Sequence, residues 1–83
     1  MTKEEFLKLQ IGVFITDHED INDPSNYCAI QEFRGTQIKL QPYEHHGQPA
    51  NAHPFWEDYR DINLTEKLYG SEYYSLSREF GSL

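Results

Sequence analysis

Cysteine is nearly absent from this sequence, which contains only Cys28. A single thiol forms no disulfide within the chain and builds no thiolate metal cluster. A catalytic cysteine needs a nearby histidine or other cation to lower its pKa, and no histidine is a close sequence neighbour of Cys28. We therefore expect Cys28 to be a small buried residue in a strand, in a protein of the reducing cytosol.

Long hydrophobic runs are also absent. The first ten residues, MTKEEFLKLQ, have acidic side chains where a secretory signal has a basic and then an apolar segment. No stretch approaches the roughly 18 apolar residues that a membrane-spanning helix needs. The sequence thus predicts a cytoplasmic protein that is neither inserted in a membrane nor exported by an N-terminal signal.

Positive charge is scarce. Seven Lys and Arg face 14 Asp and Glu, so the formal net charge is -7 on 83 residues, and the acids gather in the first 23 and the last 27 residues. The resulting negative potential repels phosphate backbones and attracts basic surfaces. We therefore expect no direct binding of nucleic acid, and a basic protein as the partner.

Aromatic residues, in contrast, are abundant: the chain has 6 Tyr, 5 Phe and 1 Trp. A chain of 83 residues has room for one hydrophobic core. Large rings supply buried area that a small number of aliphatic side chains could not supply alone. Residues 1–83 are predicted to form a single domain, and no internal repeat is visible.

The first half of the chain predicts a short helix followed by three strands. Thr2 and Glu5 form a capping box, which marks a helix start. Residues 11–16, IGVFIT, have no helical period and predict a central strand buried on both faces. Residues 27–43 predict a β-hairpin that turns at 34–36. Its inner side would carry Cys28, Ile30, Phe33 after a bulge, Ile38, Leu40 and Pro42.

The second half predicts a loop and then helices. Residues 44–54, with two Pro, one Gly and three His, have no apolar period. Helical spacing then places Phe55, Trp56, Tyr59 and Ile62 together, and again Leu68, Tyr69, Tyr73, Leu76 and Phe80, with Tyr69 and Tyr73 inward and Tyr74 outward. Gly70 can divide the second segment in two. The predicted fold is α+β: a short N-terminal helix, a three-stranded antiparallel sheet, and two or three C-terminal helices packed on one face.

Two side-chain clusters could bind metal. Between Asp17 and Asp23 lie four acids, but as a calcium loop starting at Asp17 the sequence has Asn22 where glycine is needed and Cys28 where a bidentate glutamate is needed. The other cluster, His45, His46 and His53, has the right chemistry for zinc and a spacing that matches no known finger or helical metal motif. We expect no cofactor, and keep the three histidines as the alternative metal site.

The leading hypothesis for function is a non-enzymatic interaction module that inhibits or regulates a basic, nucleic-acid-binding protein. Its sharpest form is a DNA mimic of phage or mobile-element origin, in which carboxylates stand where phosphates bind. The alternatives are a metal-binding protein or metal-dependent enzyme built on the histidine loop, and a subunit of an obligate complex, with a homodimer also possible. The predicted partner-binding residues are Asp17, Glu19, Asp20, Asp23, Glu57, Asp58, Asp61, Glu66, Glu72 and the exposed aromatic Tyr74.

Overall fold

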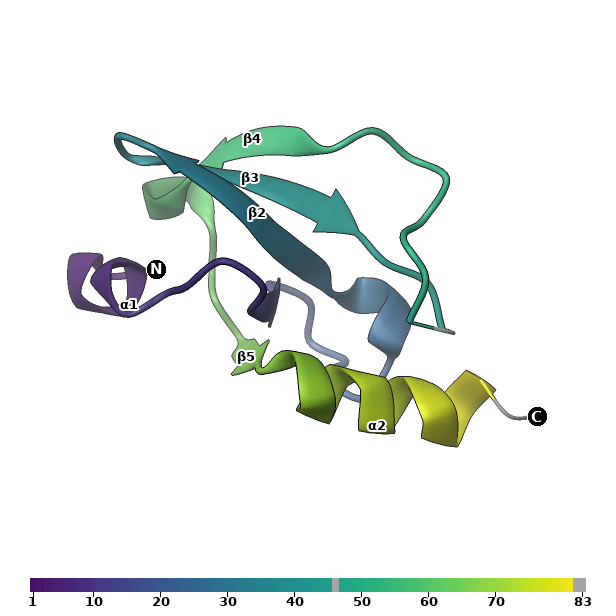
Figure 1. Ribbon diagram of the computed structural model, residues 1–83. Coiled ribbons are helices and arrows are strands. Elements are labelled where there is room, and N and C mark those ends of the chain that lie inside the picture. Colours follow the sequence, from purple (N-terminus) through teal and green to yellow (C-terminus); the bar gives the residue numbers. More distant parts are fainter. Residues whose placement is uncertain (46, 82–83) are drawn as a thin grey trace.

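The computed structural model describes residues 1–45 and 47–81. Their elements, in chain order, are α1 (Lys3–Leu7), β1 (Phe14–Thr16), the 3-10 turn η1 (Pro24–Asn26), β2 (Cys28–Arg34), β3 (Gln37–Pro42), β4 (Phe55–Asp58), the 3-10 turn η2 (Tyr59–Asp61), β5 (Glu66–Leu68) and α2 (Gly70–Gly81). The strands form one antiparallel sheet in the order β4-β3-β2-β1-β5 (Figure 1). Four strands follow one another as a meander, and β5 returns to the far edge beside β1.

The predicted architecture is therefore wrong in both of its main parts. The sheet has five strands rather than three, and the described C-terminal region holds one helix, α2, rather than two or three. The short N-terminal helix is confirmed, and its capping box is complete: the Thr2 hydroxyl accepts from the Glu5 N–H, and the Glu5 carboxylate accepts from the Thr2 N–H.

Residues 55–58 form a strand where the sequence predicted a helix. Leu40 pairs with Phe55 and Ile38 with Glu57, so β4 covers the outer edge of β3. Backbone N–H and C=O groups along that edge gain hydrogen-bond partners from β4, which a helix could not supply. The apparent helical spacing of apolar residues arises instead from a strand followed at once by the η2 turn.

The segment before α2 was also predicted as helix, and it forms β5. Phe14 pairs with Leu68, and Thr16 with Glu66, so β1 has neighbours on both sides. Helix α2 starts at Gly70, so this glycine begins the helix and does not divide a longer one. Tyr69, predicted to face inward, is 64% exposed because it precedes the helix, where its N–H donates to the Glu72 carboxylate.

The hairpin prediction is confirmed. Strands β2 and β3 pair from Cys28 with Pro42 to Arg34 with Gln37, and the predicted bulge lies between Ile30 and Glu32. The turn has two residues, of which Gly35 takes φ +59°, a conformation that glycine adopts without steric cost. Strand β1 is shorter than predicted but is buried on both faces, and β2 rather than β1 is the middle strand.

Two apolar clusters lie on opposite faces of the sheet. The core face carries Ile15, Ile30, Ile38 and Leu40, and it is covered by α1, residues 9–13 and Ile62. The helix face carries Phe14 and Ala29, which pack with Tyr27 against Tyr73 of α2. No helix in residues 1–45 and 47–81 is both long and apolar enough to cross a bilayer.

Candidate functional site

The acidic loop, residues 17–26, is held in shape by its own hydrogen bonds. Asp23 caps η1, accepting from the N–H of Ser25 at 3.0 Å and from its hydroxyl at 2.8 Å. These bonds to Ser25 hold the pKa of Asp23 below its usual value. The Asp20 carboxylate accepts from the Asn22 N–H at 3.1 Å. Both carboxylates therefore have set positions while part of each remains open to a ligand.

A buried tyrosine ties this loop to the body of the protein. The Tyr27 hydroxyl donates to the carbonyl of Ile21 at 2.7 Å, inside the loop. Burial, together with the charges of Glu66 and Asp20, raises the pKa of Tyr27 to about 12. The hydroxyl thus stays protonated at neutral pH, and Glu66 of β5 lies close to the loop because it pairs with Thr16 at the end of β1.

Only part of the predicted partner-binding set comes together. Asp17, Glu19, Asp20 and Asp23 share the loop, and Glu66 lies beside it, since β5 pairs with the end of β1. The other acids are spread over separate elements, because their segment is not a continuous helix. Glu57 and Asp58 point to opposite faces of β4, Asp61 is exposed on η2, and Glu72 lies in the first turn of α2.

Asp58 differs from the acids of the loop because its carboxylate is ion-paired with an arginine. It accepts from Arg60 Nε at 2.9 Å, from Arg60 Nη2 at 2.8 Å and from the Thr36 hydroxyl at 2.8 Å. The bonds to Arg60 and Thr36 strongly lower the pKa of Asp58. This carboxylate links the β2–β3 turn to η2 and has little capacity left for a partner.

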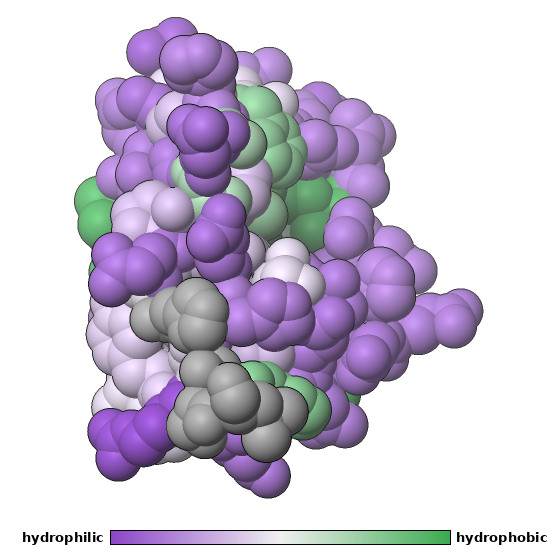
Figure 2. All heavy atoms as spheres, turned by 90° about the vertical axis from the view of Figure 1, so that its right-hand side faces the viewer, coloured by the Kyte–Doolittle hydropathy of each residue, from purple (hydrophilic) through white to green (hydrophobic). Residues whose placement is uncertain are grey.

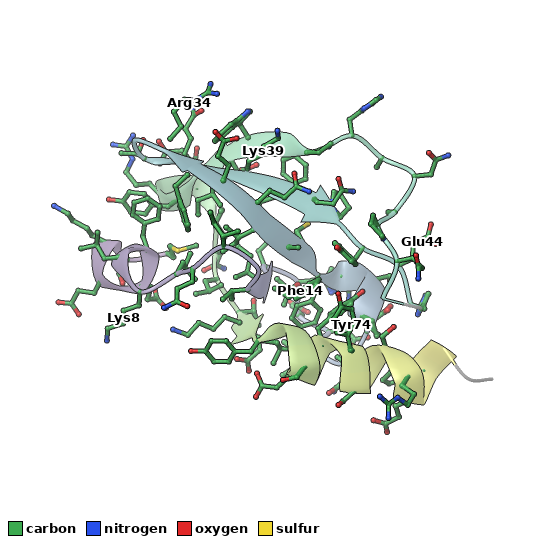
Figure 3. The ribbon with its side chains drawn as sticks, viewed as in Figure 1. Lys8, Phe14, Arg34, Lys39, Glu44 and Tyr74 are labelled. Atoms are coloured by element: carbon green, nitrogen blue, oxygen red, sulfur yellow. The ribbon has the colours of Figure 1, made fainter. Side chains whose placement is uncertain are left out.

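Two positive side chains of the sheet, Arg34 and Lys39, lie away from the acidic loop, whereas Lys67 of β5 pairs with Ile15 next to it. The Arg34 guanidinium stacks 4.4 Å from the ring centre of Trp56, and Lys39 pairs with the same tryptophan across β3 and β4. Figure 3 shows Arg34 and Lys39 near the top of the view, at the end of the sheet away from α2. Along the sequence, the acidic loop lies in a stretch without positive charge, because between Lys8 and Arg34 the chain has no Lys or Arg.

Tyr74 on α2 is 48% exposed, in agreement with its predicted outward position. Its ring meets Phe14 edge to face, with 6.0 Å between centroids (Figure 3). Figure 2 faces the end of the molecule that includes the C-terminal part of α2, and most of the surface there is hydrophilic. One part of the Tyr74 ring therefore packs against Phe14, and the rest of the side chain is exposed to solvent.

The alternative metal site gains no ligand set from the structure. His45 and His53 are both exposed, and His45 Nδ1 lies 3.6 Å from an Asp23 carboxylate oxygen. His46 lies outside the described residues. Within residues 1–45 and 47–81, no group of three His, Cys, Asp or Glu side chains is placed to hold a metal ion.

A pocket of about 60 Å³ opens at the core face, where β1 ends and β4 begins. Its apolar lining comes from the buried Ile15, Leu40 and Ile62 and from the partly exposed Phe55. Its polar lining comes from Thr16, Asp17, Asn26, Cys28 and Glu57. Sequence reasoning missed this site because it read Phe55 and Glu57 on a helix, whereas strand alternation puts both on one face.

Cys28 lines the pocket, and its thiol is less reactive than a free one. Burial, aided by the charge of Asp17, raises the pKa of Cys28 to about 11 from an ordinary 9.0. Since the thiolate is the nucleophile, the native protein at pH 8 should react with iodoacetamide roughly a hundredfold more slowly than the chain in denaturant. Mass spectrometry over time measures both rates, and equal rates would contradict this environment.

Comparison with family models, with curated proteins and with solved structures found no match to this chain.

Proposed function

We propose that this protein is a non-enzymatic interaction module of the cytoplasm, whose acidic surface binds a basic, nucleic-acid-binding protein and inhibits or regulates it. One observation carries the proposal. The four carboxylates of the acidic loop lie in a stretch without Lys or Arg, and in the described part of the chain none of them is ion-paired with either. Their charge is therefore available to a partner.

The geometry supports the DNA-mimic form of this proposal in one respect. Local hydrogen bonds to Ser25 and Asn22 hold the Asp23 and Asp20 carboxylates in place before any partner arrives. Preorganised charges lose less conformational entropy on binding than charges on free side chains. Glu66 extends the same negative region onto β5, and Tyr74 supplies an aromatic contact from α2.

The test begins with capture from cell lysate on the tagged protein, followed by elution with rising salt. The expected result is one basic protein that elutes as salt increases, because attraction between exposed charges is screened. Duplex DNA binding by that purified protein should then be lost when this chain is added in stoichiometric amount. Undiminished DNA binding in the presence of excess chain would exclude the inhibitory role.

A further inference from the structure

The pocket on the core face has an apolar floor and an exposed aromatic side chain at its rim. Ile15, Leu40 and Ile62 form the floor and are only 3%, 5% and 5% exposed. At the rim, the Phe55 side chain is 41% exposed although it lies on the same face as Leu40. An uncovered aromatic beside an apolar floor is the kind of surface that binds the alkyl part of another molecule.

Two carboxylates from different parts of the chain line the same pocket. Asp17 follows the last residue of β1, and Glu57 lies on β4 directly across from Ile38. The Asp17 charge acts on the neighbouring Cys28 thiol. Among the described residues, no Lys or Arg lines the pocket; Lys67 lies on the neighbouring strand β5, where it pairs with Ile15.

We infer that this pocket receives one lysine or arginine side chain of the basic partner, an inference that rests on the proposed function. The alkyl chain lies on Ile15, Leu40 and Phe55, and the cationic end lies between Asp17 and Glu57. Lysine and arginine bury their stems in this way while the charge keeps polar contacts. The volume of about 60 Å³ holds several water molecules, which a short alkyl chain would displace.

Two other occupants fit less well. A calcium ion takes six to eight oxygen ligands, whereas this pocket combines two carboxylates with an apolar floor. A neutral apolar ligand would remove water from Asp17 and Glu57 without giving them a partner, and burial of an unpaired charge is costly. An alkyl chain that ends in a cation satisfies both halves of the pocket.

The direct test uses n-butylammonium as the probe, with n-butanol and n-butyrate as chain-matched controls. The inference predicts saturable amide chemical-shift changes at Ile15, Cys28, Leu40 and Phe55 for n-butylammonium, weaker changes for n-butanol and none for n-butyrate. Equal affinity for the cation and the alcohol would overturn it. Shifts confined to residues 18–25, away from the pocket, would overturn it as well.

Matched variants separate the pocket from the overall charge. Glu57→Gln and Glu19→Gln remove the same charge, but only Glu57 lines the pocket. Glu57→Gln should weaken n-butylammonium binding about tenfold, as expected for loss of a charge-assisted contact, and Glu19→Gln by less than about twofold. Phe55→Ala and Phe80→Ala remove rings of similar exposure, 41% and 42%, and only the first should weaken binding. Equal effects within either pair would overturn the inference.

The same variants keep this inference separate from the proposed function. If the native chain, Glu57→Gln and Glu19→Gln all capture a basic protein equally well, the proposed function is supported. The pocket then does not bind a side chain of that partner, and the inference fails. If no basic protein is captured at all, the proposed function fails, and the n-butylammonium titration still decides whether the pocket binds an alkyl cation. Melting temperatures near the native value confirm that each variant is folded.

Discussion

Replacement of Tyr73 by alanine is expected to remove a large part of the protein's free energy of unfolding. Tyr73 is completely buried, its ring stacks on Phe14 with 4.1 Å between centroids, and its edges meet Tyr27 and Tyr43. Truncation of a buried aromatic costs about 3–5 kcal/mol. A domain of this size has roughly 4–12 kcal/mol of total stability. Urea denaturation followed by circular dichroism measures the loss.

Two further variants define what the tyrosine contributes. Tyr73→Phe keeps the ring and removes the hydroxyl, which donates to the Glu44 carbonyl at 2.6 Å, so it should cost about 1 kcal/mol. Tyr69→Ala removes an exposed ring from the same end of α2 and should change stability by less than about 0.5 kcal/mol. If Tyr73→Ala were as stable as Tyr69→Ala, the aromatic cluster would not be what attaches α2 to the sheet.

Conversion of the acidic loop to amides should slow association with the basic partner about 10- to 100-fold at low salt. The variant combines Asp17→Asn, Glu19→Gln, Asp20→Asn and Asp23→Asn. The fold should persist, because an amide oxygen still accepts from the N–H groups of Asn22 and Ser25. Surface plasmon resonance at two salt concentrations measures the association rate.

The matched control removes four exposed acids elsewhere, with Glu4→Gln, Glu32→Gln, Asp61→Asn and Glu79→Gln. Both variants change the net charge from -7 by the same four units. The control should slow association less than the loop variant, and the difference should disappear at high salt, where the Debye length is only a few ångströms. Equal slowing would mean that total charge, rather than the acidic loop, attracts the partner.

Features built from neighbouring residues were predictable from the sequence. The capping box at Thr2 and Glu5, the hairpin turn around Gly35 and the bulge before Phe33 each depend on a few consecutive side chains and on backbone preferences. The acidic loop was predictable for the same reason, since Asp and Asn followed by Pro and Ser favour turns in any context. The burial of Tyr73 also followed from its spacing along α2.

Strands β4 and β5 were not predictable in this way. Each has only four or three residues, too few for a period to distinguish strand from helix. Each pairs with a strand whose backbone edge would otherwise be open, so tertiary hydrogen bonds outweighed the helical spacing of Phe55, Tyr59 and Ile62. The same spacing wrongly placed Glu57 on a helix, so the pocket that Glu57 lines was not predicted from the sequence.

The charge, the local turns and caps, and the acidic loop thus follow from residue types and their near neighbours in the chain. Long-range strand pairing, in contrast, produces the five-stranded sheet, puts Glu57 and Asp58 on opposite faces of it, and brings Asp17 and Glu57 to one pocket. The physical reason is that strand pairing joins distant segments through backbone hydrogen bonds, which carry no signature in the order of side chains.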